Sequence, residues 1–255
     1  MNINIKFLEK ELVGTTVPKP VSGTLSGHAA GEPFDKHVYR LIKEKYNGKT
    51  FRQYELLNKL YSENPKATTV EDRQNLITAP ALAFLLNRGK EATKVWSTEN
   101  LFVEKQNDTA DIVVVENDFF NIIDVKTYNF SLNGQPPNII SSYKLARMAA
   151  LMLETGDFSS HDITYIGVTW EIEGENLKCS KATVKELFKT DPASLYINWA
   201  AAMQIQFHVE NLDQSYKGNP EQWCTDYLRK FVVQAEERAD TMLRKFVKPF
   251  QKFLK

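Results

Sequence analysis

The sequence predicts an α/β protein in which a mixed central β-sheet is flanked by helices and a long helix ends the chain. Segments 110–115 and 119–125 are short, rich in β-branched residues and almost continuously apolar, which is typical of strands buried on both faces. The segments before and after them repeat apolar residues every three or four positions, as amphipathic helices do. The last of these segments is the longest and extends from Pro220 to Lys252.

Three helices are expected before the first strand. In the first helix, Pro33 suits the opening turn, where its missing N–H group costs no hydrogen bond. The third helix is expected to end at 88–90, because Gly89 between two basic residues is a stop signal. The apolar positions are Phe34, Val38, Leu41, Ile42 and Tyr46 in the first helix, Tyr54, Leu57 and Tyr61 in the second, and Leu82, Leu85 and Leu86 in the third.

After the two apolar segments, the pattern changes between helix and strand again. A helix is expected from Ile139 to Glu154, and strands at 163–170, around 177–179 and at 203–209. In the C-terminal helix, Pro249 interrupts the pattern near the end. The apolar stripe of this helix consists of Leu228, Phe231, Val232, Ala235, Met242 and Phe246.

The composition is typical of a globular protein. The chain has 255 residues, 42% of them hydrophobic, and its 32 Lys and Arg balance its 32 Asp and Glu. No internal repeat or low-complexity linker divides it, so we expect a single domain spanning 1–255. Its two cysteines are too few for a disulfide framework, and neither a signal peptide nor a membrane span is recognisable, so we expect a cytoplasmic protein. Zero net charge still allows a locally basic cleft for a nucleic acid.

The two apolar segments place three charged side chains together. If Asn117 and Asp118 form a two-residue hairpin turn, Asp111 lies opposite Asp124, and Thr109 lies opposite Lys126. Opposite residues on paired strands are about 4.5–5.5 Å apart. Because strand side chains alternate between the two faces, Asp124 and Lys126 point the same way. Two carboxylates and one lysine therefore share one face at one end of the sheet.

These three residues suit a divalent metal site. Two adjacent carboxylates repel each other, and a bound cation removes that repulsion. Asp111, Asp124 and the backbone carbonyl of Val125 supply the oxygen ligands that Mg²⁺ prefers, with Mn²⁺ as a substitute. Lys126 would help to deprotonate or orient an attacking water and offset negative charge at phosphorus. The reaction indicated is metal-assisted hydrolysis of a phosphodiester bond.

The same residues allow other interpretations. Asp111 and Asp124 match the spacing of about 5–5.5 Å between the carboxyl groups of a retaining glycoside hydrolase, which would need neither a metal nor Lys126. If the carboxylates only terminate strands, the protein is a non-catalytic DNA-binding module. A Holliday-junction resolvase would share the catalytic residues but would ignore the sequence of plain duplex DNA.

Asp111 followed by Asp124-Val125-Lys126 resembles the PD-(D/E)xK nuclease motif, with Ala110 in place of the proline. Longer blocks resemble the HincII type of type II restriction endonucleases, from about Pro18 to the C-terminus. These blocks are SGTLSGHAAGEPF at 22–34, EKQNDTAD at 104–111, PNIIS at 137–141 and LYINWAAAMQIQFH at 195–208. The resemblance implies a restriction-endonuclease-like core and a homodimer that cuts double-stranded DNA at the centre of GTYRAC, where Y is a pyrimidine and R a purine. It also implies blunt ends and a restriction-modification system, with a DNA methyltransferase as a functional rather than a physical partner.

The resemblance also assigns roles to individual residues. Asp111 and Asp124 would hold Mg²⁺, Lys126 would be the catalytic lysine, and Thr127 would support the metal site from behind. Gln135 would be a wedge that unstacks bases. Base or backbone contacts with DNA are implied for Asn138, Tyr196, Asn198, Lys90, Gln106 and Asn107.

The chain departs from the family pattern at two positions near these residues. Pro136 stands where the pattern has Ala, and Tyr128 stands where it has Arg. These differences concern the geometry of the loop after the catalytic strand and a phosphate contact from position 128.

Overall fold

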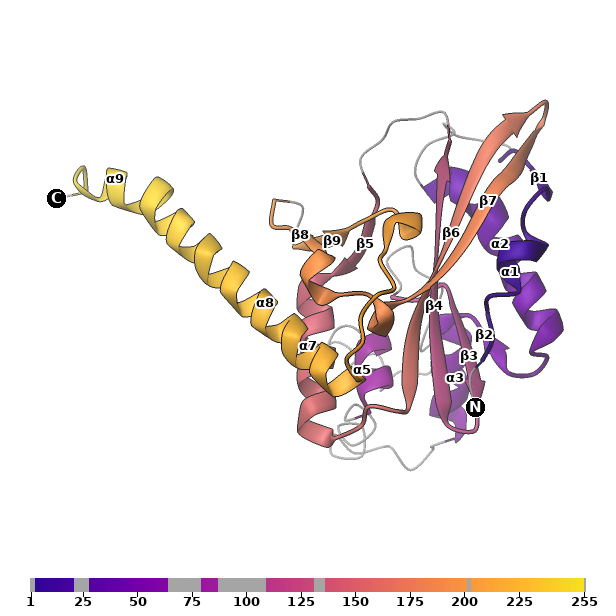
Figure 1. Ribbon diagram of the computed structural model, residues 1–255, viewed down its shortest axis with the longest axis horizontal. Coiled ribbons are helices and arrows are strands. Elements are labelled where there is room, and N and C mark those ends of the chain that lie inside the picture. Colours follow the sequence, from indigo (N-terminus) through magenta and orange to yellow (C-terminus); the bar gives the residue numbers. More distant parts are fainter. Residues whose placement is uncertain are drawn as a thin grey trace.

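The computed structural model describes residues 3–20, 28–63, 79–86, 109–130, 136–200 and 203–254. Its centre is a six-stranded sheet with the strand order β1-β7-β6-β4-β3-β2, accompanied by a smaller sheet with the order β5-β9-β8 (Figure 1). The strands are β1 Thr16–Pro18, β2 Thr50–Phe51, β3 Ile112–Glu116, β4 Phe119–Asn129, β5 Asn138–Ser141, β6 His161–Glu173, β7 Asn176–Glu186, β8 Tyr196–Asn198 and β9 Gln204–Gln206.

Helices flank both faces of the large sheet. One core unites this sheet with α1 and α2, and a second core unites its other face with α5, α7, the start of α8 and the small sheet. The helices are α1 Leu8–Glu11, α2 His28–Lys45, α3 Gln53–Glu63, α5 Pro80–Leu86, α7 Ser142–Thr155, α8 Pro220–Met242 and α9 Lys248–Gln251. None of the helices among the described residues has the length and hydropathy needed to cross a membrane.

The large sheet is mixed, as the sequence predicts. β4 runs parallel to β6, whereas the pairs β3–β4 and β6–β7 are antiparallel. Val113 and Ile122 lie in the core with α7, and Ile112 and Ile123 lie in the core with α2. The prediction that these strands are buried on both faces is therefore confirmed.

The predicted register of the β3–β4 hairpin is also confirmed. The ladder extends from Glu116 opposite Phe119 to Ile112 opposite Ile123. The turn residues Asn117 and Asp118 have φ angles of 51° and 61°. Positive φ at both positions is the requirement of a type I′ turn, whose twist matches that of the flanking strands.

The prediction for 139–154 is wrong at its start. Asn138–Ser141 is a strand, because Ile140 and Ser141 pair with Ile205 and Gln204 of β9, and α7 begins at Ser142. The strand expected at 203–209 is shorter and ends at Gln206. A short segment such as 138–141 shows no period that separates a strand from the helix that follows, so its pairing with β9 decides its structure.

The N-terminal helices differ from prediction in one respect. α2 begins at His28, so Pro33 lies inside the helix rather than in its first turn. Lys45 ends α2 close to the expected position, and α3 covers the predicted second helix. The end expected for the third helix at 88–90 lies outside the described residues. Short strands such as β2 and β8 were not predicted, because two or three residues are too few to show a periodic pattern.

Only the first part of the C-terminal helix joins the core. Trp223 and Tyr227 of α8 are buried, and Leu228 and Phe231 pack against them at the edge of the core. A π-helical segment at Leu243–Val247 separates α8 from α9 and lies just before Pro249. The missing N–H of a proline removes a regular helical hydrogen bond, and a wider turn relieves the clash of its ring. Beyond Phe231 the predicted apolar stripe does not enter the core, because Val232, Met242 and Phe246 are exposed and Ala235 is half-buried.

Candidate functional site

Asp111 is held in place through both its backbone and its side chain. It directly precedes β3, and its backbone N–H donates to the carbonyl oxygen of Ile123 at 3.0 Å. Its Oδ2 accepts a hydrogen bond from the backbone N–H of Val125 at 2.7 Å. The carboxylate of Asp111 therefore lies against β4, beside Asp124, which the predicted register places opposite it.

Asp124 and Lys126 lie on the same face of β4, as the alternation along the strand requires. Nζ of Lys126 is 2.7 Å from Oδ1 of Asp124. On the neighbouring strand β6, Tyr165 is aligned with Asp124, and Gly167 is aligned with Lys126. Thr109 lies beyond the end of the β3–β4 ladder, where its backbone N–H donates to Gln53, so its predicted pairing with Lys126 is not observed.

The charges of this group depend strongly on one another. Burial and the neighbouring carboxylate of Asp124 raise the pKa of Asp111 to about 7, against the smaller opposing effects of Lys126 and the Val125 N–H. Burial lowers the pKa of Lys126, but Asp124 and Asp111 outweigh it, so the net shift is upward. At neutral pH, Lys126 is therefore a cation. Its single positive charge is the only one beside the two carboxylates within this group.

The group has the features of a cation site. Oδ2 of Asp124 is buried and has no hydrogen-bond partner among the described residues. A buried carboxylate oxygen without a partner is costly unless a cation or water binds it. Two carboxylates and a nearby main-chain carbonyl form an oxygen-only donor set, which suits Mg²⁺. Asp111, Asp124 and the carbonyl of Val125 thus fit the predicted metal.

Two residues that sequence reasoning missed support Asp111 from the side of α3. Oε1 of Gln53 accepts hydrogen bonds from the backbone N–H groups of Thr109 at 3.0 Å and Ala110 at 2.9 Å. Nη1 of Arg52 donates to the carbonyl oxygen of Asp111 at 3.1 Å. The side chains of Arg52 and Gln53 therefore bind one backbone group in each of the three residues 109–111.

Arg52 is itself fixed by α2. Its guanidinium forms two contacts with the carboxylate of Asp35, at 2.9 Å and 2.8 Å. The same guanidinium lies over the ring of Tyr39, 4.3 Å from the ring centre. A two-point ion pair and a cation–π contact restrict the arginine strongly. α2 thus reaches the candidate site through Arg52.

Thr127 lies on the opposite face of β4 from Asp124 and Lys126. A Cβ atom at Gly31 of α2 would be 2.8 Å from Oγ1 of Thr127, so α2 can approach this closely only because position 31 has no side chain. Thr127 thus faces α2, which is the side expected of a residue that supports the site from behind. Its proposed role stays a prediction.

The small sheet carries the described residues that the resemblance assigns to DNA contact. Ile140, Ile197 and Ile205 are buried in the core. Since side chains alternate along β8 and β9, the residues on either side of their isoleucines point away from the core. The irregular register of β5 between Asn138 and Ile140 brings Asn138 to the same side, where it contacts Gln206. The outward set is Asn138 on β5, Tyr196 and Asn198 on β8, and Gln204 and Gln206 on β9, and we call it the polar face.

Gln206 connects the two asparagines of the polar face. Its Nε2 donates to Oδ1 of Asn138 at 2.7 Å, and its Oε1 accepts from Nδ2 of Asn198 at 2.9 Å. These bonds fix the orientation of three amide groups in a row. Sequence reasoning missed Gln206, although the alternation of Gln204, Ile205 and Gln206 was a visible sign of an outward-facing polar strand.

The remaining predicted contact residues cannot be placed. Lys90, Gln106, Asn107 and Gln135 lie outside the described residues, so their proposed roles stay predictions. Tyr128, where the family pattern has Arg, is described, and its ring lies 5.1 Å from that of His208.

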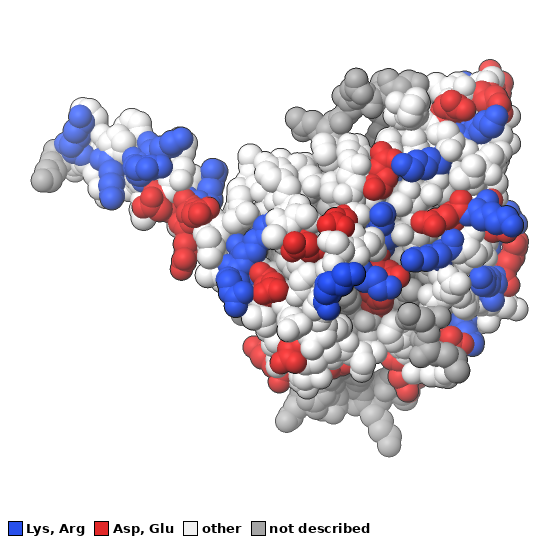
Figure 2. Space-filling view, viewed as in Figure 1, with Lys and Arg blue, Asp and Glu red and all other residues white. Residues whose placement is uncertain are grey.

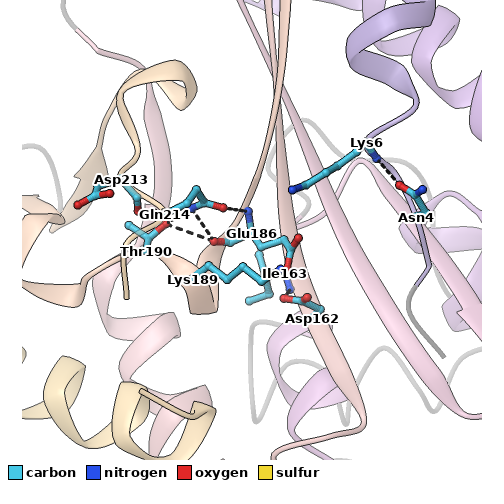
Figure 3. Close-up of polar contacts among 9 residues, drawn as sticks. All are labelled: Asn4, Lys6, Asp162, Ile163, Glu186, Lys189, Thr190, Asp213 and Gln214. Carbon is cyan, nitrogen blue, oxygen red and sulfur yellow. Dashed lines mark hydrogen bonds and ion pairs between the residues drawn. The ribbon is translucent and has the colours of Figure 1, made fainter. Parts of the chain in front are cut away.

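Asp162, at the start of β6, is a half-buried carboxylate of a different character. Burial and Glu186 raise the pKa of Asp162 to about 7. Figure 3 shows that Gln214 reaches between Glu186 and Thr190, with its Nε2 2.8 Å from Oγ1 of Thr190 and its Oε1 2.9 Å from the Glu186 nitrogen. Asp162 and Glu186 contain no buried oxygen that lacks a hydrogen-bond partner. This cluster therefore connects β7 to the following loop. Unlike Asp124, it has no buried carboxylate oxygen without a hydrogen-bond partner among the described residues.

Comparisons with known proteins point to one family. The sequence profile of the family described as Restriction endonuclease HincII matches residues 8–254. The chain is 55% identical over 243 residues to the Type II restriction enzyme HindII of Haemophilus influenzae, covering 95% of this chain and 94% of that protein. It is 54% identical, with the same coverage, to the Type II restriction enzyme HincII of Haemophilus influenzae.

Proposed function

Because this chain belongs to the HincII family of type II restriction endonucleases, we propose that it cuts both strands of GTYRAC at the centre in a Mg²⁺-dependent reaction that leaves blunt ends. The family is a family of site-specific deoxyribonucleases, so double-stranded DNA is the substrate and the glycoside hydrolase alternative is dropped. The finer statements on sequence, ends and metal rest on the resemblance and on the site.

The observation that carries the proposal is the group formed by Asp111, Asp124 and Lys126. Its two carboxylates lie side by side, one of their oxygens is buried without a partner, and the lysine contacts Asp124 at 2.7 Å. When bound, Mg²⁺ would supply positive charge beside the scissile phosphate and lower the pKa of a nearby water.

The chain's own residues have separable roles in this proposal. Asp111 and Asp124 hold the cation in their ionised forms, and the Val125 N–H keeps Asp111 turned toward β4. Lys126 keeps its proton, because its pKa is raised. It therefore acts by donating hydrogen bonds from Nζ, which orient the attacking water and stabilise negative charge at phosphorus.

The polar face is proposed to read base edges. An amide group offers one donor and one acceptor side by side, which matches the edge of a base in the major groove. Asn138 and Asn198 are oriented by Gln206, so their amides are arranged before DNA binds. A palindromic site with a cut in each strand is matched by a two-fold protein, so the active form is proposed to be a homodimer. A DNA methyltransferase protects the host as its functional partner.

The proposal is tested by digesting sequenced plasmid DNA with the purified protein and Mg²⁺, with EDTA in a parallel reaction, and by mapping all ends. We expect blunt ends confined to GTYRAC and no cleavage in EDTA. Cleavage at another sequence would overturn the specificity and leave the nuclease intact. Cleavage in EDTA would overturn the metal requirement. If the folded protein binds GTYRAC but cuts nowhere with Mg²⁺ or Mn²⁺, it is a binding module and the catalytic assignment is wrong.

A further inference from the structure

The loop that leads into β8 is held by a lysine of α8. This loop, residues 190–195, ends directly before β8. Nζ of Lys230 donates hydrogen bonds to the carbonyl oxygens of Pro192 at 3.0 Å, Ala193 at 2.7 Å and Leu195. An ammonium group has three N–H donors, so Lys230 uses all of them on main-chain carbonyls of one short loop.

These hydrogen bonds replace contacts with water. Lys230 is half-buried, and burial lowers its pKa against the smaller opposing effect of Asp191. The carbonyls belong to the 3₁₀-helical turn Pro192–Ser194 and the residue after it. Carbonyls at the end of a helical turn have no partner further along the turn, and a cation suits their partial negative charge. Lys230 therefore closes this turn at the point where the chain enters β8.

α8 also contacts the chain at the start of the loop and after β8. Nε1 of Trp223 donates to the carbonyl oxygen of Thr190 at 2.7 Å. After β8, the ring of Trp199 lies 6.0 Å from the ring of Phe231. Figure 1 shows α8 beginning in the core and continuing past the small sheet. The same helix thus holds the segments before and after β8.

β8 depends on these contacts more than a central strand would. It has three residues, and among the described strands of the small sheet its one neighbour is β9. Tyr196 and Asn198 belong to the polar face, and Ile197 between them is buried. A strand this short forms few hydrogen bonds of its own, so the segments at its two ends decide where it lies.

We propose that Lys230 is a positioning residue for base recognition, because its ammonium group fixes the loop that sets the position of β8 and thereby of Asn198 and Tyr196. This inference rests on the proposed reading of base edges by the polar face. Lys230 itself contacts no base and acts through the main chain of 192–195. A recognition group must be held within about 0.5 Å of its productive position by the residues around it.

Two other roles of Lys230 predict different results. If Lys230 only stabilises the fold, its removal lowers the free energy of unfolding and leaves base discrimination unchanged. If Lys230 binds a DNA phosphate directly, its removal weakens binding to every duplex by a similar factor and reduces the salt dependence of binding.

The test compares full-length variants of two adjacent residues. Lys230→Met keeps an unbranched side chain and removes the ammonium group. Arg229→Met makes the same charge change at an exposed side chain that contacts Asp226 of its own helix at 3.0 Å, so it is the control. Asn198→Ala removes a proposed base-reading amide and is the reference for lost recognition.

Three quantities are measured for each variant. Hydrogen exchange of the backbone amides at 195–199 is followed without DNA or Mg²⁺, so this result is independent of cleavage. Base discrimination is the ratio of kcat/KM on a GTYRAC duplex to that on duplexes with one altered base. Urea unfolding establishes that each variant is folded, and anisotropy gives the affinity for an unrelated duplex.

In Lys230→Met, the amides at 195–199 should exchange at least about ten-fold faster than in the native protein, because the loop before β8 opens more easily. Discrimination should fall about ten-fold, because the amide of Asn198 is no longer held against the base edge. Affinity for an unrelated duplex should stay within about three-fold of the native value, since no phosphate contact is lost. Arg229→Met should match the native protein in all three respects.

Native exchange or native discrimination in Lys230→Met would overturn the inference. Equal losses in Arg229→Met would show that the lost charge is responsible, and equal weakening on every duplex would show a direct phosphate contact; either result overturns it. If Asn198→Ala loses discrimination and Lys230→Met does not, the role of Lys230 alone is wrong. If Asn198→Ala keeps native discrimination, the polar face does not read bases, and the proposed reading and the role of Lys230 are both wrong.

Discussion

Asp111 is oriented by the protein before any metal binds. Its side chain is bound by the Val125 N–H, and its carbonyl oxygen is bound by Arg52. Such preorganisation matters because a ligand displaced by even about 1 Å loses much of its catalytic value. At the scale of single residues, the candidate site is therefore a set of proposed metal ligands together with the side chains that fix the backbone beneath them.

Removal of a catalytic side chain should separate cleavage from binding. We expect Asp124→Ala and Lys126→Ala each to lower the cleavage rate at least about a thousand-fold, because each removes charge that is needed in the transition state. Binding to a GTYRAC duplex should change less than about three-fold. Asp118→Asn, in the exposed turn of the same hairpin, keeps a residue that tolerates the positive φ there, so it serves as the control and should cut normally. Single-turnover cleavage and fluorescence anisotropy measure the two quantities, and appreciable cleavage by either variant would exclude that residue from the mechanism.

The raised pKa of Asp111 predicts a pH-dependent stability. In the folded metal-free protein this pKa is about 7, above the ordinary value of 3.8 for an aspartate, so the folded state binds more protons between these pH values. The free energy of unfolding should therefore fall as pH rises from about 4 to about 7. At pH 8 without metal, Asp111→Asn should be more stable than the native protein, by on the order of 2 kcal/mol.

Addition of Mg²⁺ should reverse that order. The native protein should gain about 2.7 kcal/mol at one hundred times its dissociation constant, whereas Asp111→Asn should gain little. Urea unfolding at several pH values, with and without Mg²⁺, measures both effects. If the native protein is as stable as the variant at pH 8 without metal, burial of ionised Asp111 beside Asp124 does not destabilise the fold, and the prediction is wrong.

Gln53 should affect the rate more than substrate affinity. Gln53→Ala leaves the buried N–H groups of Thr109 and Ala110 without their acceptor, so we expect a loss of about 1–3 kcal/mol in stability. Since Asp111 follows directly, kcat should fall about ten-fold while KM stays nearly constant. Gln53→Glu keeps an acceptor oxygen and should restore most of the rate. Equal loss of rate in both variants would show that the hydrogen bonds to 109 and 110 are not responsible.

The elements of the small sheet combine core packing and the proposed DNA contact in one residue pattern. Its isoleucines complete the core beneath α7 and α8, and its polar face carries the amide row. α7 begins directly after β5, so the position of Asn138 depends on the packing of that helix. The polar face is thus held in place because each of its strands has a buried isoleucine in the core.

Gln206 should influence specificity through its two neighbours. Gln206→Ala removes the acceptor of Asn198 Nδ2 and the donor to Asn138 Oδ1, so the amide row is broken, although Asn198 keeps the hydrogen bond from the Ala200 N–H. We expect cleavage of GTYRAC to weaken and discrimination against single-base variants of the site to fall by about 1–3 kcal/mol. Comparison of kcat/KM on the matched and altered duplexes measures this. Gln204→Ala, on the same strand but outside the row, is the control, and equal loss in both variants would contradict the assignment.

At the scale of the whole molecule, charge supplies little general attraction to DNA. The whole chain has 32 acidic and 32 basic residues. In the view of Figure 2, both kinds are interspersed over the body. DNA binding must then depend on local contacts with phosphates, and each such contact releases counterions. We expect the affinity for a GTYRAC duplex to fall roughly a hundred-fold or more between 50 and 200 mM salt. Anisotropy titrations at several salt concentrations test this, and a flat response would exclude extensive phosphate contacts.

The predictions from sequence succeed where the causes are local. The β3–β4 hairpin was predictable in strand position and register, because turn chemistry and alternation both lie within about fifteen residues. They fail where a distant segment decides the outcome. Residues 138–141 form a strand because they pair with β9. The helix after Phe231 is exposed because no described element packs against its apolar residues.

By itself, the sequence determined the family, the mixed sheet and the position of Asp111, Asp124 and Lys126, since the hairpin fixes these three through local geometry. The tertiary structure alone decided which residues support them. Arg52 and Gln53 meet the loop before β3 across 59 and 57 positions of the chain, and Gln206 meets Asn138 across 68. Contacts over such separations leave no periodic pattern in the sequence, because they arise only when the packing of helices and sheets brings the segments together.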